Sequence, residues 1–183
     1  ISSESCKEVA SGLTTLDGIT QKQYASFTID GRKGILKLLQ DRYGNIPIQL
    51  CHFHQQQIMK RYLTSRPKSP CGRHLKALVS TLTTTDEEVF TKHFLHFQET
   101  FKEFLKEKNE QGKYQHKRLR SAVRSLEQNM LYLFTYQRFP SLNIPNTTNS
   151  CDGSFAHWKQ KIQIHRGLKK HRRKKMLDTL LSI

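Results

Sequence analysis

Alternating strand-like and helix-like segments between residues 20 and 64 constrain the fold of this chain most strongly. A strand ending at Asp30 is predicted by "YASFTID", in which aromatic or β-branched residues alternate with small ones. A short helix with Ile35, Leu38 and Leu39 facing inward follows in "GRKGILKLLQDRYG". A second strand, "IPIQLC", and a second helix, "HFHQQQIMKRYLT", come next. Strands that are joined through a helix run parallel, so this segment predicts a parallel sheet covered by helices.

The rest of the chain is predicted to be almost wholly helical. A joint rich in Pro and Gly, "SRPKSPCGRH", precedes this region. Phenylalanines then recur at helical spacing, which places them on one face of a single helix, at positions 90, 94, 97, 101 and 104. Apolar residues of "HKRLRSAVRSLEQNMLYLFTY" repeat the pattern, at positions 119, 123, 126, 130 and 133. We therefore expect antiparallel helices packed through an apolar core, and a separate helix ended by Gly18 near the start of the chain.

Length and composition indicate one globular domain, or one domain with an insertion. The 183 residues suffice to bury a core without disulfide bonds. No apolar run approaches the ~20 residues that cross a bilayer, and no signal-peptide pattern precedes "ISSESCKEVA". The four cysteines are scattered, and we expect them to be reduced in a cytoplasmic setting. Because the chain begins at Ile1 rather than Met, we also expect it to be a fragment.

A large positive charge predicts a polyanionic partner. Lys and Arg total 31 against 15 acidic residues, which gives a formal charge of +16. Nine of these cations and no acid lie from Lys159 to Lys175. Nucleic acid is the simplest partner, because each neutralised phosphate releases counterions. An anionic membrane surface is the alternative, but the apolar residues beside the basic run are bunched at its end, in Met176–Ile183, which favours nucleic acid.

Two acids and one Cys/His pair are candidates for chemistry. Asp30 follows a strand, where α/β folds place active groups, and Asp152 is a lone acid just ahead of the basic run. The two could hold Mg²⁺ at a phosphate backbone, or each could cap the helix that follows it. Cys51 and His54 could bind zinc in a zinc-stabilised helical interaction module, although four ligands are needed and no second close pair follows. A packed Cys and a hydrogen-bonded His at a strand end is the more ordinary interpretation.

Two ordered motifs resemble the Mutator-type transposases and their bacterial insertion-sequence relatives. The first is an Asp-Gly strand end followed by Cys-x-x-His after the next strand, in "FTIDGRKGILKLL" and "IPIQLCHFHQQQIMKRYLT". The second, "IPNTTNSCDGSFAHWKQKIQIHRGL", is similar to that family's Thr-Asn-x-x-acid motif and the helix after it. A helical region separates the two motifs, as in the family, and the resemblance covers most of the chain.

The resemblance implies an α/β fold that is mostly helical overall, namely an incomplete ribonuclease H-like fold interrupted by a large all-α insertion. Residues 1–64 would form the ribonuclease H-like part, 65–145 the insertion, and 146–183 the return to the catalytic core. The implied activity is DDE-type transposition, in which Mg²⁺ (or Mn²⁺) supports hydrolysis at transposon ends and joining of the 3′-hydroxyl to target DNA. The implied partner is double-stranded DNA, both the terminal repeats of the transposon and the target. A homodimer would cut this DNA. The protein would act in the bacterial cytoplasm at the nucleoid, with no membrane involved.

Individual roles follow from the same resemblance. Asp30 would be the second catalytic acid and Asp152 the third, and both would bind the metal. Cys51, His54 and Asn149 would support the site. The residues expected to contact DNA phosphates rather than read bases are Lys159, Lys161, His165, Arg166, Lys169, Lys170, Arg172 and Arg173.

Two departures from the family pattern leave a second function open. The third acid of the family is usually Glu, whereas this chain has Asp152. The first acid should lie well before Asp30, yet only Asp17 precedes it, at the end of a predicted helix, so we expect the first acid upstream of Ile1. The alternative function is a non-catalytic, domesticated DNA-binding protein that keeps the transposase fold.

Overall fold

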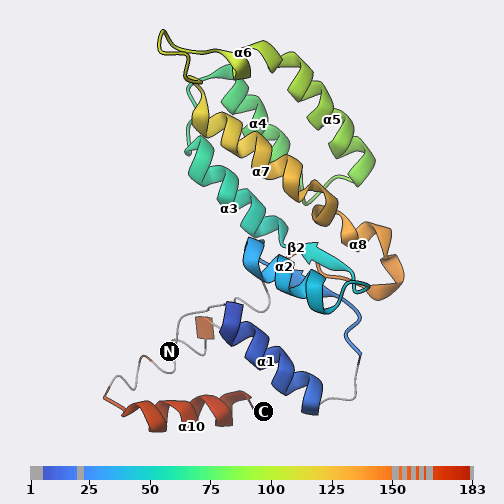
Figure 1. The fold of residues 1–183 in the computed structure, drawn as a ribbon, viewed down its shortest axis with the longest axis vertical. Coiled ribbons are helices and arrows are strands. Elements are labelled where there is room, and N and C mark those ends of the chain that lie inside the picture. The colour runs from blue at the N-terminus through green and yellow to red at the C-terminus, as the bar shows by residue number, and fades with distance from the viewer. Residues whose placement is uncertain are drawn as a thin grey trace. The chain divides into compact units, whose positions relative to one another are not determined.

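The computed structural model describes residues 6–19, 23–149, 153, 156–157, 160, 163 and 167–181. The chain divides into two compact units, Ile1–Thr147 and Thr148–Ile183. Figure 1 shows that helices dominate the first unit. Its elements are, in chain order, α1 (Cys6–Ile19), β1 (Phe27–Ile29), α2 (Lys33–Arg42), β2 (Ile48–Leu50), α3 (His52–Leu63), α4 (Pro70–Ser80), α5 (Glu87–Thr100), α6 (Lys102–Lys106), α7 (Lys117–Leu133), α8 (Thr135–Arg138) and the 3-10 turn η1 (Pro140–Leu142). The second unit contains α10 (Lys170–Leu181).

The predicted parallel sheet is present and small. Strand β1 pairs with β2 in parallel, with Phe27 opposite Ile48 and Ile29 opposite Leu50. Helix α2 makes the connection between them and buries Leu39. All three residues of β2 are buried, whereas those of β1 are half-buried. The strand–helix–strand–helix order and the parallel direction are therefore confirmed, in strands of only three residues each.

Helices α3, α4, α5 and α7 form a bundle that shares its core with β2. Helix α3 packs against α7 and α4, and α4 packs against α5 (Figure 1). Large side chains with no more than 2% exposure fill its centre, among them Leu50, Met59, Leu75, Leu82, Phe90, Leu126, Leu133 and Phe134. Burial of each such side chain stabilises the fold by about 1.5–3 kcal/mol. None of the described helices is long and apolar enough to cross a membrane.

The phenylalanine stripe does not lie on one continuous helix as predicted. Phe90, Phe94 and Phe97 are buried on α5, but the helix is interrupted at Phe101, whose φ of −108° and ψ of 15° are not helical. The Thr100 hydroxyl donates a hydrogen bond to the His96 carbonyl at 2.8 Å, and such back-bonding bends helices. The stripe therefore continues on the short helix α6 with a change of direction.

The joint predicted between the α/β segment and the helices is shorter than its Pro and Gly content indicated. Helix α4 begins inside it at Pro70, and the Ser69 hydroxyl accepts a hydrogen bond from the Gly72 N–H at 3.1 Å. A Ser cap followed by Pro at the first helical position is a strong start signal. The composition of the joint does not distinguish a loop from a helix start, because Pro and Gly occur at both.

The Asp17 carboxylate links α1 to the end of α2 through hydrogen bonds. Asp17 accepts hydrogen bonds from Arg42 Nη2 at 2.6 Å and from the Tyr43 hydroxyl at 2.8 Å. These bonds, that of Tyr43 first and that of Arg42 next, lower the pKa of the Asp17 carboxyl. Asp17 is thus a structural residue of the α1–α2 contact, in agreement with its predicted place at a helix end.

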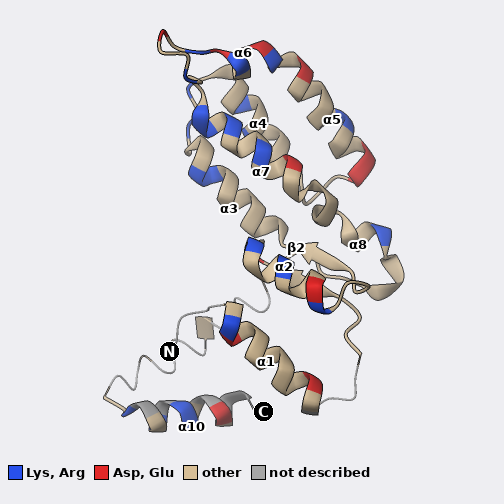
Figure 2. Cartoon of the chain, viewed as in Figure 1, with Lys and Arg blue, Asp and Glu red and all other residues tan. Residues whose placement is uncertain are grey.

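Charge is unevenly distributed over the first unit (Figure 2). On α5 and α6, Lys and Glu side chains pair, with Lys102 at 3.4 Å from Glu99 and Lys106 at 3.2 Å from Glu103. Helices α3 and α4 contain no acidic residue. The ends of α3 and α7 that lie together carry Lys and Arg.

Candidate functional site

The carboxyl ends of β1 and β2 bring Asp30 and Cys51 to one edge of the sheet. Ile29 and Leu50 are paired, and each is followed directly by one of these two residues. The Cys51 N–H donates to the Ile29 carbonyl at 2.8 Å, so the parallel ladder continues to the point where both strands end. The two motif residues that the sequence places 21 positions apart therefore start from adjacent backbone positions.

The chain returns to this edge after the helical bundle. The Pro145 carbonyl accepts a hydrogen bond from the Thr28 hydroxyl at 3.0 Å. The Asn146 carbonyl accepts one from the His52 N–H at 2.9 Å. Ile144, just before them, is 5% exposed. The beginning of the second sequence motif, at Pro145 and Asn146, is thus hydrogen-bonded to the strand ends that carry the first motif.

The Asp30 carboxylate is held by the loop that follows it. Its Oδ1 accepts a hydrogen bond from the Arg32 N–H, and its Oδ2 pairs with Arg32 Nε, both at 3.1 Å. Its side chain is 36% exposed. Gly31 between them has φ of +87°, a conformation that favours glycine. The N-cap of α2 is Arg32, without a side-chain capping hydrogen bond, so the helix-capping interpretation of Asp30 is wrong. Asp30 stands two residues before that N-cap, with part of its carboxylate accessible.

The buried polar residue of the "CHFH" segment is His52, which the sequence motif does not include. Cys51 is 1% exposed and precedes the first turn of α3, and His54 is half-buried. His52 is fully buried, and its Nε2 lies 2.5 Å from the Leu133 carbonyl. Burial lowers the pKa of the His52 imidazole, so the ring is neutral and its Nε2–H donates to that carbonyl. His52 thus joins the start of α3 to the end of α7.

Metal binding at this edge would require residues beyond those described. Within residues 6–19, 23–149 and the described positions after them, no group of three or more His, Cys, Asp and Glu side chains could hold a metal ion. Cys51 and His54 therefore do not gain further zinc ligands from that part of the chain. Asp152, the predicted partner of Asp30, lies outside the described residues, so their pairing stays a prediction.

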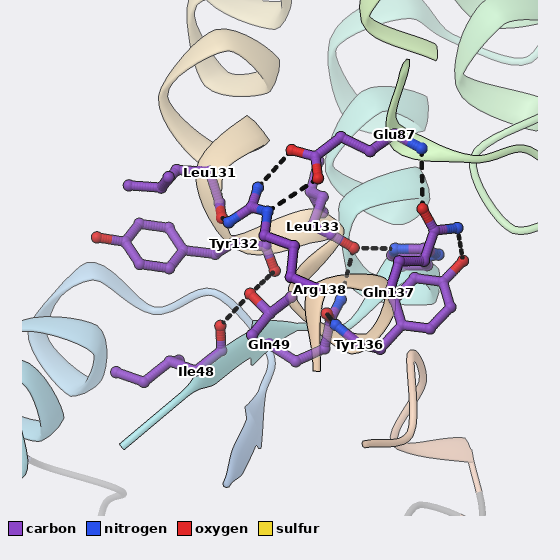
Figure 3. Close-up of polar contacts among 11 residues, drawn as sticks. Ile48, Gln49, Glu87, Leu131, Tyr132, Leu133, Tyr136, Gln137 and Arg138 are labelled. Carbon is purple, nitrogen blue, oxygen red and sulfur yellow. Dashed lines mark hydrogen bonds and ion pairs between the residues drawn. The ribbon is translucent and has the colours of Figure 1, made fainter. Parts of the chain in front are cut away.

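A buried polar network fixes the site's strand to the bundle (Figure 3). Gln49, in the middle of β2, donates to the Leu133 and Leu50 carbonyls, each at 2.7 Å, and accepts from the Tyr136 N–H at 2.9 Å. The Thr135 hydroxyl donates to the Ile48 carbonyl at 2.7 Å. Sequence reasoning did not single out Gln49, although an amide inside an apolar strand has to find hydrogen-bond partners when it is buried. The network sets the position of the helices relative to the strand ends.

A second set of contacts continues the network to α5. Arg138 donates from Nε to the Glu87 carboxylate at 2.8 Å, and the Gln137 side-chain oxygen accepts from the Glu87 N–H at 2.8 Å. The hydrogen bond to Glu87 raises the pKa of the Arg138 guanidinium. Helix α8 therefore links the sheet on one side to the first turn of α5 on the other, as Figure 3 shows.

The predicted DNA-contacting residues belong to the second unit, and part of them lie outside the described residues. These outside residues are Lys159, Lys161, His165 and Arg166. Lys170 and Arg173 belong to α10, and Lys169 and Arg172 are exposed. Asn149 is also exposed. The described part of the predicted basic run is thus in part helical.

Comparisons with known proteins gave no relative. A scan against protein-family models, a search of curated proteins and a search of solved structures each found no match.

Proposed function

We propose that this chain is the catalytic-domain part of a Mutator-type DNA transposase with a ribonuclease H-like fold. The observation that supports the proposal most is the meeting of three motif segments at one sheet edge. Asp30 ends β1, Cys51 ends β2, and the segment leading to Asp152 is hydrogen-bonded to the same two strand ends at Pro145 and Asn146. Ligands and active groups of open α/β folds gather at the carboxyl ends of parallel strands.

In this proposal Asp30 and Asp152 are the carboxylates that hold the metal. A bound Mg²⁺ would supply charge stabilisation at the scissile phosphate and a more acidic attacking group. Arg32 keeps the Asp30 carboxylate turned toward the start of α2. Gln49 and His52 bind the Leu133 carbonyl and so fix the end of β2, the strand that pairs with the one Asp30 follows. In this proposal they would support the position of the acid. The cations that follow Asp152 in the sequence would bind the phosphate backbone.

A second function, a non-catalytic DNA-binding protein with the same fold, is favoured by one contact. The Asp30 carboxylate is already bonded to Arg32 through both oxygens. A metal ion would have to share these oxygens with the Arg32 guanidinium, and the two positive charges would repel each other. If Arg32 has taken the place of the metal, the chain would bind DNA without cutting it.

Metal binding by the full chain separates the two functions. Mn²⁺ can replace Mg²⁺ and its binding can be followed by electron paramagnetic resonance. We expect Asp30→Asn and Asp152→Asn each to abolish tight Mn²⁺ binding, and Asp41→Asn, which removes an exposed acid of α2, to leave it unchanged.

The same variants are then tested for Mg²⁺-dependent nicking of a supercoiled plasmid. Nicking by the wild type that both site variants lose supports the catalytic function. Wild-type protein that binds the plasmid but neither binds Mn²⁺ nor nicks refutes it and supports the DNA-binding function instead.

A further inference from the structure

Eleven cations lie on α3, α4 and α7 and on the loops beside these helices. They come from two stretches without any acidic residue, 43–85 and 111–126. We call this surface the basic face, and its members are Lys60, Arg61, Arg66, Lys68, Arg73, Lys76, Lys113, Lys117, Arg118, Arg120 and Arg124. Figure 2 shows Lys and Arg on the adjoining ends of α3 and α7. The basic face belongs to the first unit and does not include the basic run after Asp152.

The charges of the basic face are not cancelled within the described residues. None of its eleven members forms an ion pair with a carboxylate of that part of the chain, whereas Lys102, Lys106 and Arg138 on the other helices do. Gathering eleven like charges without acids is unfavourable for the free protein. The arrangement therefore points to a polyanion that supplies the missing negative charge.

Backbone carbonyls hold several of these guanidinium groups in place. Arg118 donates to the Arg61 carbonyl, Arg120 to the Leu105 carbonyl at 2.9 Å, and Arg73 to the Lys68 carbonyl at 2.6 Å. A carbonyl orients a guanidinium and leaves its net charge available. Ordered Arg side chains lose less entropy when they bind phosphate oxygens.

The basic face is hollowed where phosphates could lie. A groove of about 470 Å³ between α3 and α7 is lined by Arg61, Tyr62, Lys117, Arg118 and Ser121, together with Ile58. A second hollow of about 460 Å³ lies beside the loop between α3 and α4. Its charged lining residues are Arg66, Arg73 and Lys76. Cations thus border both hollows, with hydroxyl groups between them.

The composition of the face favours nucleic acid over a membrane or an acidic protein. Membrane binding needs bulky apolar side chains among the cations, and protein interfaces are built around apolar or aromatic anchors. Two large hydrophobic residues of the two acid-free stretches are exposed among the described residues, Phe53 and Tyr114. Phe53 lies in the first turn of α3, at the opposite end of that helix from Lys60 and Arg61. The Arg120 guanidinium covers the Tyr114 ring, 3.6 Å from its centroid. Phosphates need no apolar anchor.

We propose that the basic face is a second double-stranded DNA contact, which grips the phosphate backbone through the ends of α3 and α7. The inference rests on the proposed function for the DNA partner, but it assigns binding to the helical bundle as well as to the basic run. If the inference holds, removing cations of the basic face and removing cations of the basic run should each weaken duplex binding.

Salt dependence of duplex binding by the full chain tests this assignment. The face variant is Arg61→Gln, Arg66→Gln, Lys117→Gln, and its matched control is Lys92→Gln, Lys102→Gln, Lys106→Gln on α5 and α6, which removes the same formal charge. Each lost phosphate contact should lower the slope of log K against log salt by about 0.9. We expect the face variant to lower the slope by about 1–3 and the control to lower it by less than about 0.5. A charge-keeping variant, Arg61→Lys, Arg66→Lys, Lys117→Arg, should bind as the wild type does, which excludes misfolding as the cause.

A third variant, Lys169→Gln, Arg172→Gln, Lys174→Gln, distinguishes the two proposals. If it lowers the slope while the face variant behaves like the control, the basic face is not a DNA contact but the DNA-binding function stands. If the wild type shows no salt-dependent duplex binding, the proposed function itself fails. A face variant that loses binding to anionic vesicles or to acidic peptides, but not to duplex DNA, also overturns the inference.

Lysine footprinting gives a measurement that needs no substitution. Duplex DNA should protect Lys60, Lys68 and Lys117 from acetylation, relative to Lys92 and Lys102 in the same sample. Equal protection of both groups would contradict a contact confined to the basic face.

Discussion

Replacing Gln49 by leucine should weaken the link between β2 and the bundle without leaving a cavity. The substitution keeps the size of the side chain but removes two donated hydrogen bonds and one accepted one, to the Leu133 and Leu50 carbonyls and from the Tyr136 N–H. At roughly 1 kcal/mol each, the three bonds contribute about 3 kcal/mol, and better burial of the leucine side chain offsets about 1 kcal/mol. We therefore expect the free energy of unfolding to fall by about 2 kcal/mol.

Urea unfolding followed by circular dichroism measures this change, and hydrogen exchange locates it. The Tyr136 amide should exchange faster in Gln49→Leu, because it loses its acceptor. Gln57→Leu on α3 is the control, since the Gln57 side chain makes no hydrogen bond to the described residues, and it should alter stability by less than about 0.5 kcal/mol. If Gln49→Leu costs no more than this control, the network does not hold the strand in place.

Three further outcomes can be measured on the same protein. Gly31→Ala should lower the free energy of unfolding by about 1–2 kcal/mol in urea titrations, because φ is +87° there, whereas Gly18→Ala in the open last turn of α1 should cost nothing. The lowered pKa of Asp17 stabilises the fold above the pKa of an unfolded aspartate, and this stabilisation is lost as the pH falls through the lower pKa of the folded state. Asp17→Asn should therefore flatten the decrease of stability in acid, measured by thermal melting. Burial raises the pKa of the Cys71 thiol to about 11, so a thiol reagent at neutral pH should label the exposed Cys6 in the folded protein and reach Cys71 only after unfolding.

The sequence predicted the order and direction of the α/β elements because each element has a local signal. When a helix connects two strands of one sheet, the strands run parallel, so the order strand, helix, strand predicts the parallel direction. The core of α7 followed in the same way, since Leu126 and Leu133 are both fully buried at the predicted spacing. Apolar periodicity of this kind depends on the residue's own helix and needs no knowledge of its neighbours.

The interruption at Phe101 and the role of Gln49 could not be predicted in this way. The bend depends on a hydroxyl that bonds back to its own helix, and the spacing of the phenylalanines is the same with and without it. Gln49 finds its partners 84 and 87 residues away, at Leu133 and Tyr136. Contacts between residues so far apart depend on the packing of α7 against β2, which no local pattern encodes.

For the candidate site, the sequence predicted where residues lie better than it predicted the contacts that they make. The positions of Asp30 and Cys51 at adjacent strand ends follow from the β-α-β pattern. The ion pair of Asp30 with Arg32 does not, although Arg32 is only two positions away, because it requires Gly31 to adopt a positive φ. The occupation of both Asp30 carboxylate oxygens by Arg32 is therefore visible only in the structure.

Arginines of the first unit differ in whether a carboxylate is among the acceptors that orient them. Arg42 and Arg138 are bonded to carboxylates, which hold secondary structure elements together and cancel the charge at the same time. Arg73, Arg118 and Arg120 are bonded to backbone carbonyls, which fix the guanidinium and cancel nothing. If these three served stability alone, a nearby acid would serve it better, because a carboxylate adds the attraction of a full negative charge to the hydrogen bond and a carbonyl does not. The absence of acids from 43–85 and 111–126 is thus best explained by a need for charge that stays available to phosphate. We therefore expect an acid placed within the basic face, Ser121→Glu in the α3–α7 groove, to lower duplex affinity at low salt without destabilising the fold. An unchanged affinity would contradict a phosphate contact at this groove.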